Sequence, residues 1–191
     1  MNICVYGASS NQINEIYIEK VEELGEKMAM RGHTLVFGAG NSGCMGASAR
    51  GAARAHGEIV GIAPTFFEVD GVLYPHCTKF IGTETMRERK KLLEDYSDAF
   101  IVAPGGIGTL DEFFEIITLK QLERHTKAIA ILNINGYYDE LEAILNKIVD
   151  EDFAQKDTLE LAKFFTDVDD LLDYIEGYHA PKIIVSNMKH L

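Results

Sequence analysis

The residues best suited to chemistry form two short segments near the middle of the chain. The first, Pro104 to Glu112, reads PGGIGTLDE and places three glycines within four positions ahead of a carboxylate. Such glycines let backbone N–H groups converge, and the helix expected to follow offers its positive N-terminal end to a phosphate. No lysine follows the glycines, so this is not a Walker A loop. We therefore expect ligand contacts from Gly105, Gly106, Ile107, Gly108 and Thr109.

The second segment concentrates positive charge in an acidic chain. Arg87, Arg89, Lys90 and Lys91 supply 4 of the 18 Lys and Arg residues in a chain of net charge −12. One interpretation is a solvated helix face supported by Glu-to-Lys pairs. The other notes that Met86, Arg89 and Lys90 share one helical face at i, i+3 and i+4, and so form one wall of an anion site.

The role of Glu112 is open at this stage. Thr109 and Glu112 have the T-x-x-E spacing of a capping box, which would make the carboxylate a helix cap. A carboxylate beside a phosphate loop also suits catalysis, and the sequence does not separate the two roles.

A second glycine-rich segment, Gly38 to Gly43, matches G-x-G-x-x-G. In a dinucleotide-binding fingerprint the loop would follow the first strand, and an acid about 20 residues further on would hold the ribose. Here the loop follows the second predicted strand, and the acid, Glu58, begins a strand, which argues against a nicotinamide-dependent oxidoreductase. A tight turn remains open, as does close approach to another phosphate or ribose by Gly40 and Gly43.

The elements that position these segments alternate along the chain. Apolar runs predict strands at Ile3–Tyr6, Thr34–Phe37, Ile59–Ala63, Ala99–Ala103 and Ala128–Leu132. Helical patterns cover about 13–28, 43–56, 83–96, 108–123 and 138–149. This order predicts an α/β protein with a Rossmann-like, doubly wound parallel sheet in three layers, α/β/α, and ligands beyond the carboxyl ends of the strands. We expect a single nucleotide-binding domain over residues 1–191.

Composition narrows the class of protein further. Hydrophobic residues make up 47% and charged residues 25%, which is typical of a globular domain. The cysteines Cys4, Cys44 and Cys77 have no zinc-site spacing, and we expect reduced thiols and no metal.

We find no signal peptide and no apolar run long enough for a membrane span, so we expect a cytoplasmic protein. Much of the acidity lies in residues 150–176, with 10 acids against 2 lysines, and predicts a solvated acidic helical segment at about 150–178. Nucleic acid and membranes are not expected partners.

Taken together, these segments resemble a known family. The loop continuing into Gly43-Cys44-Met45-Gly46, the pattern M-x-x-R-K at Met86 to Lys90, and PGGIGTLDE are similar to motifs of the LONELY GUY family of cytokinin-activating phosphoribohydrolases, once mislabelled lysine decarboxylases. The resemblance extends from about Ile3 to Val149 and includes the Asn-Gly-Tyr-Tyr sequence ending at Tyr138.

The resemblance implies an activity and a set of residues. It implies hydrolysis of the N-glycosidic bond of a nucleoside 5′-monophosphate, giving a purine base and ribose 5-phosphate, with no cofactor. Arg89 and Glu112 correspond to the catalytic pair, and Lys90, the glycine loop and Thr118 to the nucleotide site. Glu68 corresponds to a further substrate contact. A homodimer is expected from the family and from an apolar helix face around Ile116, Leu119 and Leu122.

The chain departs from the family pattern at Ala39, Cys44 and Arg87, which stand for a glycine, a leucine and a histidine. None of these is in the catalytic pair, but they leave the preferred base open. An alternative function is a Rossmann-type carrier that binds a nucleotide or cofactor without chemistry.

Overall fold

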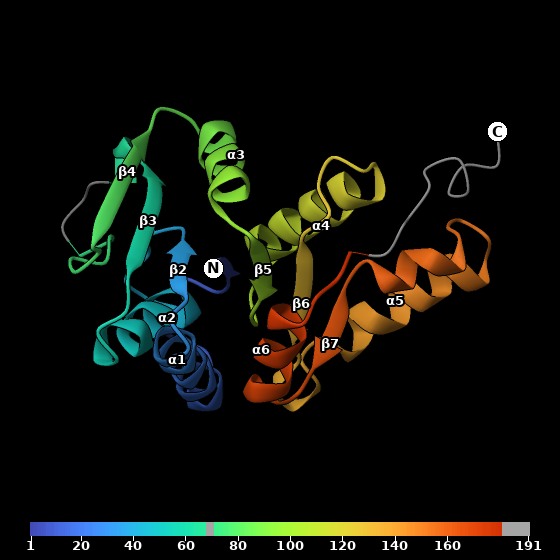
Figure 1. Cartoon of the computed structure of the whole chain (residues 1–191), viewed down its shortest axis with the longest axis horizontal. Helices are drawn as coiled ribbons and strands as arrows, with labels where there is room; N and C mark the ends of the chain where they lie inside the picture. The colour runs from blue at the N-terminus through green and yellow to red at the C-terminus, as the bar shows by residue number, and fades with distance from the viewer. Residues whose placement is uncertain (68–70, 181–191) are drawn as a thin grey trace.

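A seven-stranded parallel sheet organises the molecule in the computed structural model, which describes residues 1–67 and 71–180 (Figure 1). In spatial order the strands are β4 (Lys79–Thr83), β3 (Ile59–Pro64), β2 (Thr34–Phe37), β1 (Asn2–Tyr6), β5 (Ala99–Val102), β6 (Ala128–Leu132) and β7 (Lys163–Phe165). The chain winds outward in one direction from β1 to β4 and in the other from β5 to β7. This is the doubly wound topology, and its switch point lies between β1 and β5.

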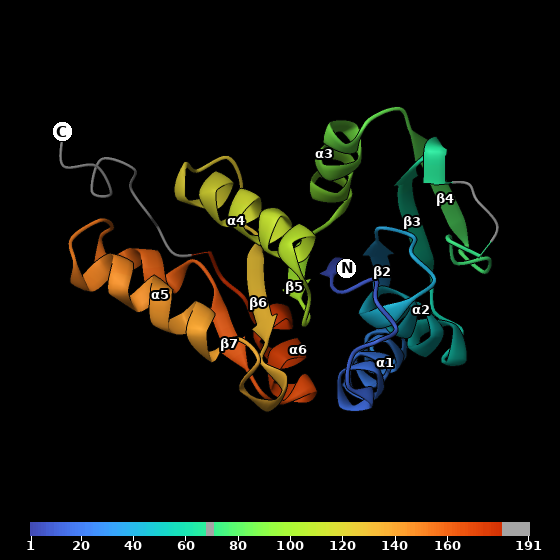
Figure 2. The ribbon, with the colours of Figure 1, turned by 180° about the vertical axis from the view of Figure 1, so that it is seen from behind.

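Helices cover both faces of the sheet. The helices α1 (Glu15–Met30), α2 (Gly43–Arg54) and α6 (Val168–Glu176) lie on one side, and α3 (Met86–Tyr96), α4 (Ile107–Gln121) and α5 (Asp139–Asp150) on the other (Figures 1 and 2). Successive residues of a strand point to opposite faces of the sheet and pack into two separate hydrophobic cores. Ile3 and Val5 of β1 belong to one core, and Cys4 and Tyr6 belong to the other. Burial on both faces explains why the central strands are almost wholly apolar. The predicted α/β/α fold is confirmed.

Two strands escaped prediction because they lie at the edges of the sheet. The strand β4 has mostly exposed residues and contains Gly82, while β7 is only three residues long and begins with Lys163. Edge strands lack the apolar run that marks a buried strand. The five predicted strands are all present, with ends that agree to within a residue.

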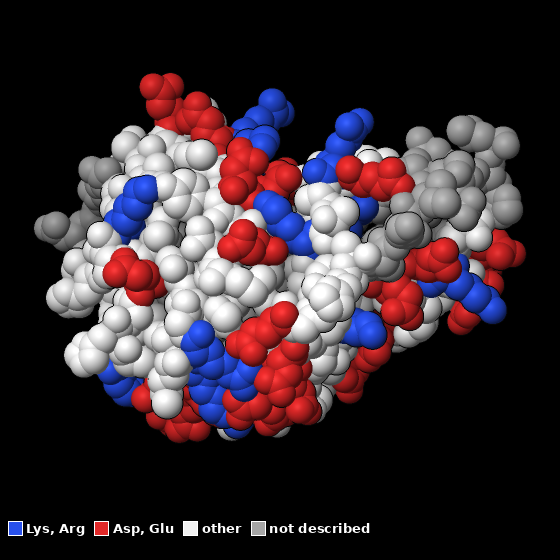
Figure 3. Space-filling view, viewed as in Figure 1, with Lys and Arg blue, Asp and Glu red and all other residues white. Residues whose placement is uncertain are grey.

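The acidic C-terminal segment differs from a continuous solvated helix. Between 150 and 178 the structure has the 3-10 helix η3 (Lys156–Glu160), β7 and α6. On α6, Asp169 and Asp173 bind Arg31, the C-cap residue of α1, at 2.7 and 2.6 Å, and Asp169 also binds Lys27 of α1. Figure 3 shows acidic and basic side chains intermingled low on this face, over α1 and α6. These acids therefore join two helices. Within the described residues, no helix is long and apolar enough to cross a membrane.

Candidate active site

A cavity of about 360 Å³ lies at the switch point of the sheet. Its walls come from the loop after β1, the start of α3 and the first two turns of α4, as expected for a ligand site in this topology. The lining residues are Gly7, Ala8, Ser9, Met45, Met86, Arg89, Lys90, Gly106, Ile107, Gly108, Thr109, Asp111 and Glu112.

An ion pair between Arg89 and Glu112 forms the deepest charged feature of this cavity. Nη1 of Arg89 donates to Oε1 of Glu112 over 3.1 Å, and the two side chains are 10% and 11% exposed. The guanidinium lies directly against Gly38, where a Cβ would be 1.9 Å from Nη2. Its Nε donates to the carbonyl of Ile62 at 3.4 Å. Arg89 is therefore held from β3, from the loop after β2 and from α4.

Glu112 does not cap its helix. The N-cap of α4 is Gly106, so Thr109 is the third helical residue and Glu112 lies well inside the helix. The capping-box interpretation is wrong because the helix begins three residues earlier than that pattern requires. Burial raises the pKa of Glu112 to about 7, although the nearby Arg89 charge opposes the shift. The carboxyl thus titrates near neutral pH, which suits a group that acts in acid–base or charge-stabilising chemistry.

Two of the four cationic side chains, Arg89 and Lys90, line the cavity, and the other two are exposed to solvent. Lys90 reaches Asp111 at 3.2 Å and Glu115 at 2.5 Å along α4, while Arg87 and Lys91 are exposed. Met86, Arg89 and Lys90 all line the cavity, as the helical spacing predicted. The solvated-face interpretation holds only for Arg87 and Lys91.

The N-terminus of α4 is open toward the cavity, whereas two of the first three N–H groups of α2 already have acceptors within the described chain. In α2, the N–H of Gly43 donates to Oδ1 of Asn11 and that of Met45 to the carbonyl of Ala8. In α4, the first three N–H groups, of Ile107, Gly108 and Thr109, have no acceptor within the described chain. Orphan N–H groups and the helix dipole favour an anion at α4. The helix after the G-x-G-x-x-G loop therefore has fewer N–H groups available to an anion than α4 has.

A second cavity of about 450 Å³ adjoins the first and shares Ser9, Met45, Met86 and Arg89 with it. Its own lining is mainly apolar or glycine. The residues that belong to it alone are Gly38, Gly40, Asn41, Ser42, Phe67, Gly71, Val72 and Leu73. Hydrogen bonds from Asn41 N to Val72 O and from Tyr74 N to Ala39 O hold the β3–β4 connection against the glycine loop.

Several predicted site residues lie elsewhere. Gly43 has φ of +60° and a Cβ there would meet the Ala8 carbonyl at 2.4 Å, so its glycine serves the turn. Gly105 is buried behind the lining, with Thr109 packed over it. Thr118 lies on the exposed side of α4 and lines neither cavity. Glu68 lies outside the described residues.

Sequence reasoning missed the contribution of the β1 loop and of Gly38. Gly7, Ala8 and Ser9 line the cavity but contain no ionisable group, so the sequence gives no chemical signal for them. Gly38 looked like a turn residue, and only the path of Arg89 from a distant helix shows why a side chain is excluded there.

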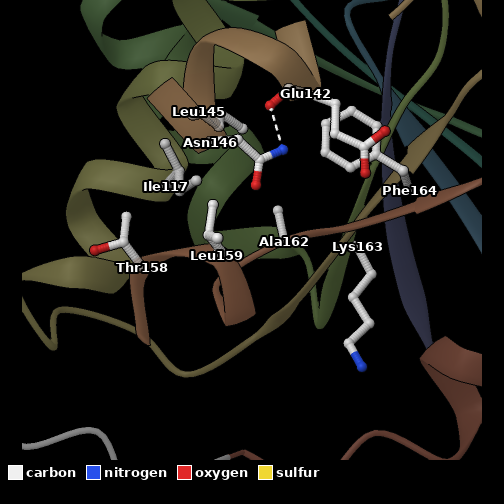
Figure 4. Close-up of a pocket in the computed structure, with 9 residues that line it drawn as sticks. All are labelled: Ile117, Glu142, Leu145, Asn146, Thr158, Leu159, Ala162, Lys163 and Phe164. Carbon is white, nitrogen blue, oxygen red and sulfur yellow. Dashed lines mark hydrogen bonds between the residues drawn. The ribbon is translucent and has the colours of Figure 1, made fainter. Parts of the chain in front are cut away.

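A third pocket, of about 210 Å³, lies between α4, α5, η3 and β7 (Figure 4). Glu142 and Lys163 bring charge to it, but the Lys163 ammonium points away from the other labelled side chains. Nδ2 of Asn146 is bonded to the Glu142 carbonyl at 2.9 Å. This pocket has no buried charged pair and is a poor candidate for catalysis. No group of three or more His, Cys, Asp or Glu residues suited to a metal occurs in the described parts of the chain.

The switch-point cavity, the open helix N-terminus and the buried Arg–Glu pair define a Rossmann-type protein with a site for a small anionic ligand. Comparison with known proteins gives the particular family. The family described as "Possible lysine decarboxylase" matches residues 45–175. The chain belongs to this family, and the resemblance to the LONELY GUY proteins is confirmed.

Two curated relatives illustrate the similarity. The cytokinin riboside 5′-monophosphate phosphoribohydrolase of Mycobacterium tuberculosis is 38% identical over 170 residues, covering 89% of this chain and 90% of the relative. A probable enzyme of the same name from Oryza sativa subsp. japonica is 34% identical over 179 residues, covering 94% and 73%.

Solved structures share the fold at lower identity. The molybdenum cofactor binding protein of Rippkaea orientalis has a TM-score of 0.71 and 22% identity, covering 92% of this chain and 94% of that protein. The Moco carrier protein of Chlamydomonas reinhardtii has a TM-score of 0.70 and 22% identity, with the same coverage. At this identity the likeness establishes the fold alone.

Proposed function

We propose that this protein is a hydrolase that splits the N-glycosidic bond of a nucleoside 5′-monophosphate, releasing a purine base and ribose 5-phosphate. The observation that carries the proposal is that the buried Arg89–Glu112 pair lines the same cavity as the open N-terminus of α4. The names of the curated relatives support the same reaction.

The geometry suggests how the residues divide the work. The 5′-phosphate binds the N–H groups from Gly106 to Thr109, with Lys90 at the rim. This places the sugar beside Glu112, whose carboxylate stabilises the oxocarbenium character that develops at C1′ and orients the attacking water. The C1′–N bond breaks with its electron pair moving to the base, and Arg89 stabilises that developing charge. Water supplies the hydroxyl for C1′ and the proton for the base.

The adjoining cavity suits the base. Met45, Phe67, Val72, Leu73 and Met86 provide apolar surface next to Arg89, which favours a purine and tolerates an apolar N6 substituent, as in a cytokinin nucleotide. No metal or cofactor is needed for this reaction as proposed.

The proposal extends to the state of the protein. We propose one nucleotide-binding domain over residues 1–191, located in the cytoplasm and assembled as a homodimer. The sequence predicts a dimer face that includes Ile116, but this side chain is buried in the chain's own core. Phe114 and Leu122 on the outer side of α4 are 42% and 43% exposed and give a better face. Light scattering at micromolar concentration would contradict the dimer if it returned the monomer mass.

The direct test is incubation with AMP and with N6-isopentenyl-AMP, followed by chromatography of the free base. We expect release of the base together with ribose 5-phosphate in equal amounts. Binding of either nucleotide without release of base would contradict the proposal and favour a carrier.

A further inference from the structure

The backbone of the phosphate loop is held from behind at four consecutive carbonyls. The hydroxyl of Tyr138 donates to the Ala103 carbonyl at 2.8 Å, and the N–H of Ala8 to the Pro104 carbonyl at 3.0 Å. The hydroxyl of Tyr137 donates to the Gly105 carbonyl at 2.7 Å, and the fourth carbonyl, of Gly106, accepts from the first helical turn at 3.1 Å.

This arrangement fixes where the N–H groups point. In a trans peptide the C=O and the following N–H point to opposite sides, and no cis peptide occurs in the described chain. Anchoring the Gly105 carbonyl to Tyr137 therefore turns the N–H of Gly106 to the opposite side of the loop. It also keeps the negative end of that carbonyl dipole away from the phosphate. The glycines leave these peptides free to rotate, so the anchor decides their orientation.

The two tyrosines are themselves held rigidly. They follow the 3-10 helix η2 (Ile134–Gly136), where Oδ1 of Asn133 accepts from the Tyr138 N–H at 2.7 Å. The Tyr137 ring packs edge-on against Tyr17 of α1, with centroids 5.6 Å apart. The anchor therefore belongs to the turn after β6 and is independent of the Arg89–Glu112 pair.

We propose that Tyr137 is a positioning residue that sets the anion affinity of the phosphate loop through the Gly105 carbonyl, with Tyr138 in a supporting role at the Ala103 carbonyl, two peptides earlier. The inference rests on the proposed function only in naming ribose 5-phosphate as the group bound. Tyr137 does not line the cavity, so its action goes through the backbone.

Tyr137→Phe removes one hydroxyl from a half-exposed ring and leaves its edge-on contact with Tyr17 in place. We expect Kd for ribose 5-phosphate, measured by calorimetry, to rise about tenfold, the value of one good hydrogen bond. KM for AMP should rise by a similar factor with kcat changed less, and the preference for AMP over adenosine should shrink. Tyr138→Phe should act in the same direction.

Tyr17→Phe is the matched control, because it removes a hydroxyl from the adjoining ring with no bond to the loop. It should leave Kd for ribose 5-phosphate unchanged, and melting curves should show that both variants are folded. Unchanged affinity in Tyr137→Phe, an equal loss in Tyr17→Phe, or no binding of ribose 5-phosphate by the wild-type protein would each overturn the proposal. Wild-type binding of ribose 5-phosphate without base release from AMP would refute the proposed hydrolase but leave this test intact.

Discussion

The sequence T-x-x-E occurs at the start of two neighbouring helices and has opposite outcomes. In α3, Thr85 is the N-cap, its side chain accepts from the Glu88 N–H at 3.2 Å, and the Glu88 carboxylate accepts from the Thr85 N–H at 3.3 Å. In α4 the same spacing joins Thr109 and Glu112, but the helix already starts after Gly106.

The difference comes from what precedes each pair. Glycines before Thr109 allow the chain to enter the helix without a side-chain cap, so the orphan N–H groups remain available to a ligand. Glu112 is then free to face Arg89, whereas Glu88 is used in closing the end of its own helix. The same two residue types thus stabilise structure in α3 and prepare chemistry in α4.

Of the changes to the site around α4, Arg89→Ala should have the largest effect on activity. It should lower kcat/KM for AMP by roughly 10² to 10³, because charge on the departing base loses its fixed partner. Arg87→Ala, two positions away on the exposed side of α3, is the control and should stay within about twofold of wild type. Equal losses in both variants would show that general positive charge, and not the buried pair, drives the reaction.

The next effect concerns the open N-terminus of α4. AMP should be hydrolysed at least a hundredfold faster than adenosine in kcat/KM, because two or three charge-assisted hydrogen bonds of about 1.5 to 3 kcal/mol each are missing with the nucleoside. Release of ribose 5-phosphate or ribose at equal substrate concentrations measures this ratio. Comparable rates would mean that α4 binds no phosphate.

The third effect is on pH dependence. Because burial raises the pKa of Glu112 to about 7, its carboxylate forms as pH rises through neutrality, and kcat/KM should rise over the same range. The Asp111 charge raises this pKa and the Lys90 charge lowers it. Asp111→Asn should therefore move the rising limb to lower pH, and Lys90→Gln should move it to higher pH.

AMP is the substrate for both variants, so ionisation of its phosphate affects both pH profiles equally. A difference in pH between the rising limbs of Asp111→Asn and Lys90→Gln therefore comes from a group of the enzyme. Limbs that coincide, or that move in the reverse order, would assign the titration to another group.

The smallest expected effect comes from removing the N-cap of α3. Thr85→Ala should lower the free energy of unfolding by about 1 kcal/mol, the usual value of an N-cap, with kcat/KM for AMP changed by less than about threefold. Urea denaturation and the AMP assay on the same sample provide both quantities. An unchanged unfolding midpoint would contradict the cap assigned to α3.

Much of the fold was predictable because buried parallel strands have a strong sequence pattern. The strand Ala128–Leu132 is wholly buried and apolar, and its predicted bounds agree with the structure. Lys79–Thr83 and Lys163–Phe165 are edge strands, whose composition resembles a loop. The binding of Asp169 to Arg31 depends on a contact between two segments that lie far apart in the sequence. A count of charges within one segment does not detect it.

The site was predictable where local spacing determines geometry. Met86, Arg89 and Lys90 line one cavity because a helix places i, i+3 and i+4 together. The Tyr137 hydroxyl meets Gly105 across 32 residues of sequence, and nothing local in the sequence indicates that contact.

The most direct test of the account is to compare Glu112→Gln with Glu88→Gln, since both keep the side-chain shape and remove one charge. Adenine release from AMP should be measured at pH 8, with melting curves for both proteins. We predict that Glu112→Gln is folded, because the amide can still accept from Arg89, and loses about 10³ in kcat. Glu88→Gln should retain nearly wild-type turnover because Gln also completes a capping box. Near wild-type turnover in a folded Glu112→Gln would contradict the central claim that this carboxylate acts in catalysis.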